Sequence, residues 1–254
     1  RTSGAATLTG TINGAGTLDV DANTTVVGII GGTTALTSVD IAAGTTLTLG
    51  AGLTYGATTT TLSGVGTGIL SLNASPHALT TNVVTATNGA GAFNVLDNAS
   101  TSSITGNIGT SAAKLATMDI ADGAANVFTT TGNLYVNAIT VNDADTLKFI
   151  GTSAQTVSGT IADGIITVGN GGATDVTFSS ALTSIASASV AAAAKATFDA
   201  NFTTTGALAN AGTIEVAAGK TLATASLTDG TGAFQIHVNN TNAAVQTFGS
   251  ITES

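Results

Sequence analysis

The sequence predicts an all-β solenoid of about ten stacked coils, and three observations support this. Short segments alternate apolar and polar residues, which is the period of a strand with one buried face. These segments, with the turns between them, recur at a spacing typical of one solenoid coil. Threonine, alanine and glycine dominate the chain, while only 7% of its 254 residues are charged and 4% are aromatic. We therefore expect a thin, repetitive core rather than one packed around large side chains.

Short strands are marked by triplets that read apolar, polar, apolar and that follow glycine or another turn residue. Four triplets are introduced by two glycines separated by one residue, or nearly so, which favours a tight turn before the strand. In chain order the triplets are Leu18–Val20, Leu70–Leu72, Phe93–Val95, Leu134–Val136, Ile166–Val168, Ile214–Val216 and Phe234–Ile236.

Corners are predicted where an aliphatic residue leads through small residues to threonine and a second apolar residue. Glycine, asparagine and aspartate in these segments tolerate the left-handed backbone that a tight corner needs. Examples are Val20–Val26, Ile41–Leu47, Val141–Leu147 and Val216–Leu222. We place Pro76 at a corner, where its missing N–H breaks no strand ladder. Ser187–Thr197 has good helix propensity, but the spacing continues across it and favours another solenoid coil.

The closing apolar residue of this corner pattern gives the predicted coil length. Its positions are 26, 47, 79, 104, 127, 147, 176, 198, 222 and 245, with a mean spacing of about 24 residues. Two steps are longer, 32 residues from Leu47 to Leu79 and 29 from Leu147 to Val176. We expect the additional residues, around 50–70 and 150–170, to project as loops. Residues 1–254 are thus interpreted as a single solenoid segment.

Composition excludes several classes of function. The formal net charge is −9 with only five lysines and arginines, so the protein lacks the basic surface that nucleic acids or anionic membranes require. No apolar run reaches the length of a membrane span, so we expect no direct membrane insertion by this segment. The absence of cysteine excludes disulfides, thiolate metal sites and cysteine nucleophiles.

Paired carboxylates are the strongest candidates for catalysis, because solenoid enzymes that act on polysaccharides use such acids. Asp143 and Asp145, or Asp19 and Asp21, are two residues apart and could share one face of a strand. Basic partners that would hold an acidic sugar are not nearby. Tyr55 and Tyr135, the only tyrosines, are expected several coils apart. We therefore assign no catalytic residue.

The remaining motifs favour structural interpretations, so no metal or cofactor is predicted. Gly219–Thr221 resembles the end of a phosphate loop, but Ile214 occupies the position of the required glycine. Asn170–Asp175 resembles half of a calcium-binding repeat, without a tandem copy. The two histidines lack a metal-ligand spacing and are interpreted as corner or surface residues. Five Asn-x-Ser/Thr triplets are expected from the threonine content alone. These residues are His77 and His237, and Asn23, Asn73, Asn98, Asn201 and Asn239.

Four longer phrases resemble the passenger regions of bacterial autotransporters, and among these the rickettsial surface cell antigens. The phrases are Gly14–Val20, Val39–Leu49, Gly206–Leu222 and Gly230–Ile236, and the resemblance extends over essentially the whole chain. It implies a right-handed parallel β-helix that is exported through the outer membrane and displayed on the bacterial cell surface. It also implies that the sequence is part of a longer passenger domain.

The resemblance further implies a non-enzymatic surface antigen that acts in virulence. Such a protein adheres to a host-cell receptor protein and promotes invasion, and it can self-associate in a surface layer (S-layer). Our leading hypothesis is therefore an adhesin, with a structural surface-layer protein as the alternative and a β-helical carbohydrate-active enzyme as a less favoured one. The family is also methylated on lysine, for which the candidates are Lys114, Lys148, Lys195 and Lys220.

Overall fold

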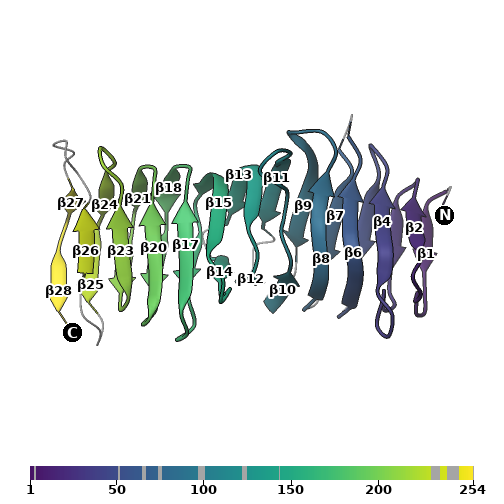
Figure 1. The fold of residues 1–254 in the computed structure, drawn as a ribbon, viewed down its shortest axis with the longest axis horizontal. Coiled ribbons are helices and arrows are strands. Elements are labelled where there is room, and N and C mark those ends of the chain that lie inside the picture. Colours follow the sequence, from purple (N-terminus) through teal and green to yellow (C-terminus); the bar gives the residue numbers. More distant parts are fainter. Residues whose placement is uncertain are drawn as a thin grey trace.

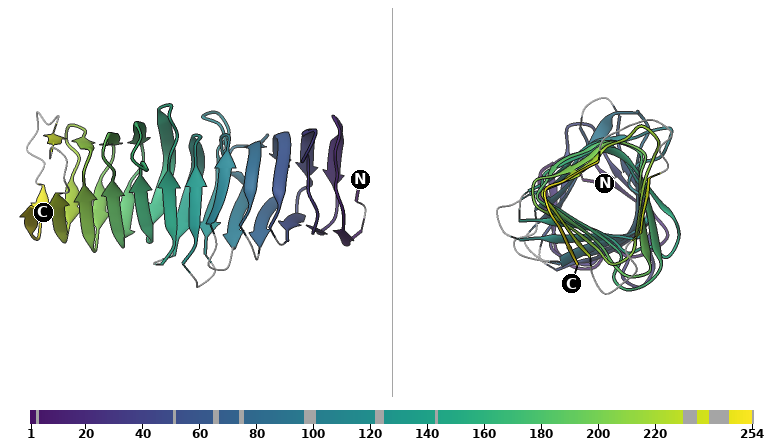
Figure 2. Two further views of the ribbon diagram at one scale, coloured as in Figure 1. Left: turned by 90° about the horizontal axis from the view of Figure 1, so that it is seen from below. Right: turned by 90° about the vertical axis from the view of Figure 1, so that its left-hand side faces the viewer.

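The computed structural model describes residues 1–2, 4–50, 52–64, 67–73, 76–96, 101–121, 125–142, 144–229, 235–238 and 246–253. These residues form a β-solenoid of about ten turns, and the regular structure within them is entirely β. The turns stack into a rod with the two termini at its opposite tips (Figure 1). Viewed along the rod, each turn is triangular (Figure 2). The predicted fold class is therefore confirmed.

All pairing between the named strands is parallel, and each strand pairs with its counterparts in the turns before and after it. One sheet runs through β1 (Ala6–Leu8), β3 (Thr24–Val26), β5 (Thr46–Leu49), β7 (Ile69–Asn73), β9 (Ala90–Leu96), β11 (Leu115–Ile120), β13 (Leu134–Val141), β15 (Gln155–Ala162), β17 (Thr174–Phe178), β20 (Ala194–Phe198), β23 (Thr213–Val216) and β26 (Gln235–Val238). A branch of this sheet leaves β15 through β18 (Leu182–Ile185), β21 (Phe202–Thr204), β24 (Leu222–Thr224) and β27 (Thr247–Phe248).

The second sheet contains the strands that alternate with these along the sequence. It runs through β2 (Thr17–Val20), β4 (Leu36–Ile41), β6 (Thr54–Leu62), β8 (Ala78–Thr85), β10 (Thr101–Thr105), β12 (Val127–Thr130), β14 (Thr146–Phe149), β16 (Ile165–Val168), β19 (Ser187–Val190), β22 (Ala207–Asn210), β25 (Ser226–Asp229) and β28 (Ile251–Glu253). Some strands of both sheets are long and bend around a corner of the triangle, as β6 does where its register with β8 shifts between Gly56 and Thr59.

The coil length agrees with the prediction, but the described residues of the two predicted loops lie largely in strands. Paired residues in successive turns lie 18 to 26 positions apart. Leu47 pairs with Leu70 rather than stacking toward Leu79, because Leu47 and Leu79 belong to different sheets. The two long steps of the predicted spacing, from Leu47 to Leu79 and from Leu147 to Val176, therefore join residues on different sheets. Residues 50–70 contain β6 and the start of β7, and residues 150–170 contain β15 and β16.

Local predictions of strands and corners are largely confirmed. The triplet Leu18–Val20 lies in β2, and the other described triplets also lie in strands; Phe234 lies outside the described residues. Pro76 is an exposed corner residue two positions before β8. The segment Ser187–Thr197 forms β19, a turn and the start of β20, and the backbone at Ala193 in that turn is left-handed with φ of 62°.

The core fills the interior of the triangle. It is formed by every second residue of the strands, whose side chains point inward. Most of these residues are leucine, isoleucine and valine, as expected from the composition. Six buried phenylalanines among the described residues depart from the expectation of a core without large side chains, and four of them follow one another along the rod. The ring centroids of these four follow one another at 5.6, 5.3 and 4.5 Å, linking β14, β17, β20 and β21 through Phe149, Phe178, Phe198 and Phe202.

Candidate functional surface

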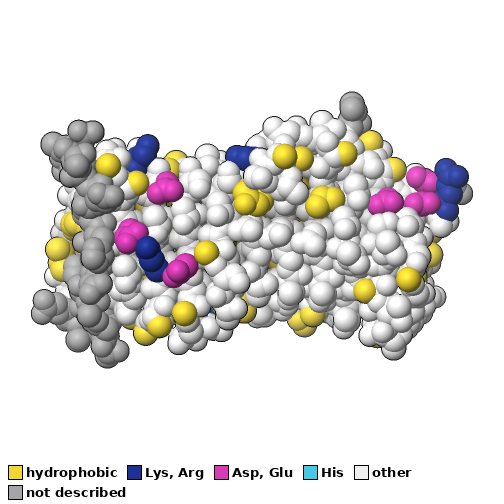
Figure 3. Space-filling view, viewed as in Figure 1, with side chains coloured by type: hydrophobic (Ala, Val, Ile, Leu, Met, Phe, Trp, Pro, Cys, Tyr) yellow, Lys and Arg dark blue, Asp and Glu magenta, His cyan; other side chains and the backbone are white. Residues whose placement is uncertain are grey.

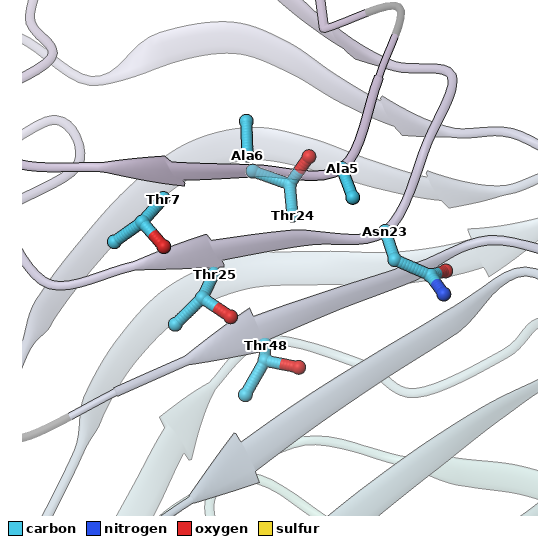
Figure 4. Close-up of a pocket in the computed structure, with 7 residues that line it drawn as sticks. All are labelled: Ala5, Ala6, Thr7, Asn23, Thr24, Thr25 and Thr48. Atoms are coloured by element: carbon cyan, nitrogen blue, oxygen red, sulfur yellow. The ribbon is translucent and has the colours of Figure 1, made fainter.

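A column of small hydroxyl side chains runs along the outside of the β1–β3–β5 sheet. Thr7 pairs with Thr25, and Thr25 pairs with Thr48, so three threonines stand above one another in successive turns (Figure 4). They point outward because the residues on either side of Thr25 and Thr48 in β3 and β5 point into the core. We call Thr7, Thr25 and Thr48 the threonine column.

The threonine column borders an open hollow of about 350 Å³ that is lined by neutral side chains. Ala5, Ala6, Asn23 and Thr24 complete its wall next to the threonine column (Figure 4). The Asn23 side-chain oxygen accepts the Thr46 main-chain N–H at 2.9 Å, which fixes the amide at the corner. The hollow can therefore offer hydroxyl and amide groups for neutral hydrogen bonds.

Beyond Thr48, Ser71 and Asn94 follow the threonine column in register, and Asp119 and Thr140 come next. Thr183 on β18 and Thr203 on β21 are exposed farther along the same sheet. The outer side of this sheet is thus mostly polar; Ser71 is largely buried, and charged side chains occur at Asp119, Asp175, Lys195 and Glu215. Parallel strand pairing fixes the spacing of these side chains along the rod at about 4.8 Å per turn.

On the face shown in Figure 3, charged side chains gather at the N-terminal tip and in a second group toward the C-terminal end, and the middle of the rod carries few. At the N-terminal tip, Arg1 Nε contacts Asp21 Oδ2 at 2.5 Å, and this hydrogen bond raises the pKa of the Arg1 guanidinium. Asp19 lies beside Asp40 of the next turn. Because Arg1 is exposed, solvent screens its ion pair, and we expect little stabilisation from it.

Toward the other tip, Lys195 Nζ contacts Glu215 Oε2 at 2.8 Å, and Asp175 is the strand partner of Lys195. Lys148 lies on β14 between Thr129 and Thr167 of adjacent turns. Lys114 and Lys220 lie in the corners before β11 and β24, respectively. All four lysines are half-buried, so each methylation candidate keeps partial access to solvent.

Among the described residues, one carboxylate considered for catalysis is buried and two are exposed. Asp145 is fully buried, and its Oδ1 accepts the Asn126 main-chain N–H at 2.8 Å; Asp143 lies outside the described residues. Asp19 is exposed on β2, and Asp21 is bound to Arg1. Asp19 and Asp21 thus lie on either side of the buried Val20 and are both exposed, whereas Asp145 is engaged in a main-chain hydrogen bond.

The two tyrosines lie three turns apart, as predicted. Tyr55 pairs with Leu79, and Leu79 pairs with Ile104. Ile104 pairs with Thr130, which lies in the turn that contains Tyr135. Tyr55 is buried, and its phenol oxygen lies 2.6 Å from Thr60 Oγ1. Burial raises the pKa of the Tyr55 phenol, because the phenolate would lose its hydration.

A buried polar corner on the second sheet is a feature that sequence reasoning did not identify. The Leu53 main-chain N–H donates to His77 Nδ1 at 3.2 Å, and the His77 main-chain N–H donates to Ser102 Oγ at 2.8 Å. Asp145 accepts in the same way from Asn126 at the corresponding corner, before β12. These side chains bind main-chain groups where the backbone turns out of the ladder. The available signal was a polar residue standing directly before a strand.

The remaining motifs lie in corners and strands. Gly219 and Lys220 form a turn in which the Lys220 N–H donates to the Ala217 carbonyl at 3.1 Å. Asn170–Asp175 spans the turn before β17 and its first two residues, and His237 lies in β26. In the described residues no three histidine, aspartate or glutamate side chains come together. Nor does a helix long and apolar enough to cross a membrane occur there.

The asparagines of the Asn-x-Ser/Thr triplets also occupy strand ends and corners. Asn201 accepts the Thr221 main-chain N–H at 3.1 Å, as Asn23 does from Thr46, and Asn73 is exposed at the end of β7. Asn98 and Asn239 lie outside the described residues.

No protein-family model matches the sequence, and no curated protein or solved structure matches it either.

Proposed function

We propose that this protein is a non-enzymatic passenger segment of an autotransporter, displayed on the bacterial surface, where it adheres to a receptor protein of the host cell. The observation that carries the proposal is a solenoid whose outer wall presents the threonine column beside a neutral hollow. The resemblance of the four sequence phrases to autotransporter passengers supports the location and the receptor class.

The chemistry of this wall suits a protein partner better than a charged ligand. Centres of protein interfaces are depleted in lysine and glutamate, whose desolvation and ordering oppose binding. Threonine loses less rotamer freedom than a long charged residue, and it keeps one donor and two acceptor sites. Parallel pairing holds the column in place before a partner arrives, so little additional ordering is needed on binding.

Binding of the purified monomer to cultured host cells tests the adhesin proposal. Replacing Thr25 and Thr48 by lysine places two charges in the threonine column, and we expect cell binding to weaken by about tenfold or more. The matched control replaces Thr183 and Thr203 by lysine, on the same sheet several turns away. Circular dichroism and thermal melting establish that both variants are folded.

Two outcomes contradict the adhesin proposal. One is a folded monomer without saturable binding to host cells. The other is unchanged binding by the folded Thr25→Lys, Thr48→Lys variant, which would remove the threonine column from the contact. If the control pair also weakens binding, the contact extends along the sheet and the proposal stands.

A structural role in a surface layer is the second candidate function. Val27 and Ile29 are exposed by 45% and 41%, respectively, in the segment after β3, and contacts between rods would cover them. A layer-forming protein self-associates with rising concentration in the absence of cells or receptor. Sedimentation across a concentration series separates this function from adhesion, and a protein that remains monomeric at all concentrations contradicts it.

A further inference from the structure

Three Asn–Gly pairs occur in the sequence, and the structure distinguishes one of them. They are Asn13–Gly14, Asn88–Gly89 and Asn170–Gly171. In this dipeptide the small glycine leaves its main-chain nitrogen accessible to the preceding side-chain amide. All three asparagines are exposed, so solvent access alone does not separate them.

The first two pairs are held by hydrogen bonds to the next turn of the solenoid. The Asn88 side-chain oxygen accepts the Lys114 N–H at 2.9 Å, while the Gly89 N–H donates to the Lys114 carbonyl at 2.8 Å. In the same way the Asn13 oxygen accepts the Thr33 N–H at 3.1 Å, and the Gly14 N–H donates to the Thr34 carbonyl at 3.3 Å. Both the amide and the nitrogen that would attack it are therefore occupied.

Asn170–Gly171 has neither restraint among the described residues. It lies in the turn between β16 and β17, and no hydrogen bond holds the Asn170 amide or the Gly171 N–H there. The surroundings are open as well, since a Cβ built on Gly171 meets no atom within 4 Å. The turn can thus change its backbone without disturbing a neighbour.

We propose that Asn170 is a site of spontaneous deamidation in the folded protein. The Gly171 main-chain nitrogen loses its proton and attacks the amide carbonyl carbon of the Asn170 side chain. A new C–N bond forms there, the original bond from that carbon to the amide nitrogen breaks, and ammonia leaves. Water then opens the resulting five-membered imide at either carbonyl. The products are aspartate and isoaspartate, and the only co-reactant is water.

The modification changes the outer wall of the rod locally. Each product adds a carboxylate to an exposed turn, close to Asp175 at the start of β17. Isoaspartate also inserts one methylene into the backbone, which the open surroundings of Gly171 accommodate. We therefore expect a more acidic protein with an unchanged fold.

Mass spectrometry of protein incubated in mildly alkaline buffer tests this inference. Trypsin releases residues 149–195, in which Asn170 is the only asparagine, so the change from amide to acid in that peptide reports on this site. We expect Asn170 to deamidate about tenfold faster than Asn13 and Asn88, whose reaction first requires local opening. Fragment ions locate the change at the two slower sites.

Incubation in urea provides the control for structure, because there all three pairs should react at similar rates. An Asn170→Gln variant should lose the fast reaction, together with the isoaspartate detected by isoaspartyl methyltransferase labelling. Equal rates at the three sites in the folded protein would overturn the proposal. So would an Asn170 that stays intact when folded but reacts in urea.

Discussion

At the scale of single residues, several polar groups enter the core with partners from their own turn or from the next one. Tyr55 is the clearest example, because its ring fills the interior while its hydroxyl meets Thr60, which in turn lies 3.0 Å from Thr81 of the next turn. Gln155 is also buried, and its amide binds the Gly151 N–H and the Gly132 carbonyl. Burying a polar group lowers the free energy of unfolding little when the group is hydrogen-bonded and much when it is left unpaired.

The raised pKa of Tyr55 leads to a prediction for alkaline solution. The buried site disfavours the Tyr55 phenolate. The contribution of Tyr55 to the free energy of unfolding is therefore constant below the ordinary tyrosine pKa of about 10 and falls as the pH rises above it. In a Tyr135→Phe variant Tyr55 is the only tyrosine. We expect its phenolate absorbance to stay absent in folded protein at a pH where the urea-unfolded protein shows it. Identical titration curves for the two states would contradict the buried position.

At the scale of elements, β15 determines where the larger sheet divides into two branches. Its first half pairs with β17 and its second half with β18. Opposite this bend, β13 has a register shift between Tyr135 and Ala138, and Gly159 lies between the two halves of β15. A Cβ at Gly159 would lie 1.8 Å from the Val136 carbonyl oxygen. Glycine is therefore required by close backbone approach.

Gly159→Ala tests this role of the bend. The added methyl group must displace the β13 backbone, and we expect a loss of at least about 2 kcal/mol in the free energy of unfolding. Gly16→Ala is the matched control, because a Cβ there meets nothing within 4 Å and the backbone is not left-handed. Urea unfolding measures both. A Gly159→Ala variant as stable as the control would show that the strands do not approach in this way.

The strands can be predicted well from the sequence and the faces on which they lie only poorly, for a physical reason. Alternation in Leu18–Val20 or Ile166–Val168 is local and reports directly that one side of a strand is buried. Assignment of Leu47 and Leu79 to faces depends on stacking with other turns, and a repeated phrase does not contain that information. The buried role of His77 was missed because its partners come from adjacent turns.

At the scale of the whole molecule, stacking explains the unusual composition. Every exposed side chain in a strand has near neighbours in the turns on either side, so repeated like charges would repel along the rod. The observed charges accordingly include the ion pairs of Arg1 with Asp21 and of Lys195 with Glu215. Threonine avoids this repulsion, and its branched side chain favours strands. The same property leaves a wall of low charge for contacts with a partner.

Disulfide formation between engineered cysteines tests the stacking of the turns most directly, because the native sequence has no cysteine. Thr167 and Ser189 are strand partners whose hydroxyl oxygens lie 3.2 Å apart, although 22 positions separate them in sequence. The account predicts that a Thr167→Cys, Ser189→Cys variant oxidises readily to an internal disulfide. The control, Thr167→Cys with Ala209→Cys, places the thiols two turns apart and should remain reduced. Cross-linking of the control pair, or none in the first pair, would contradict the solenoid.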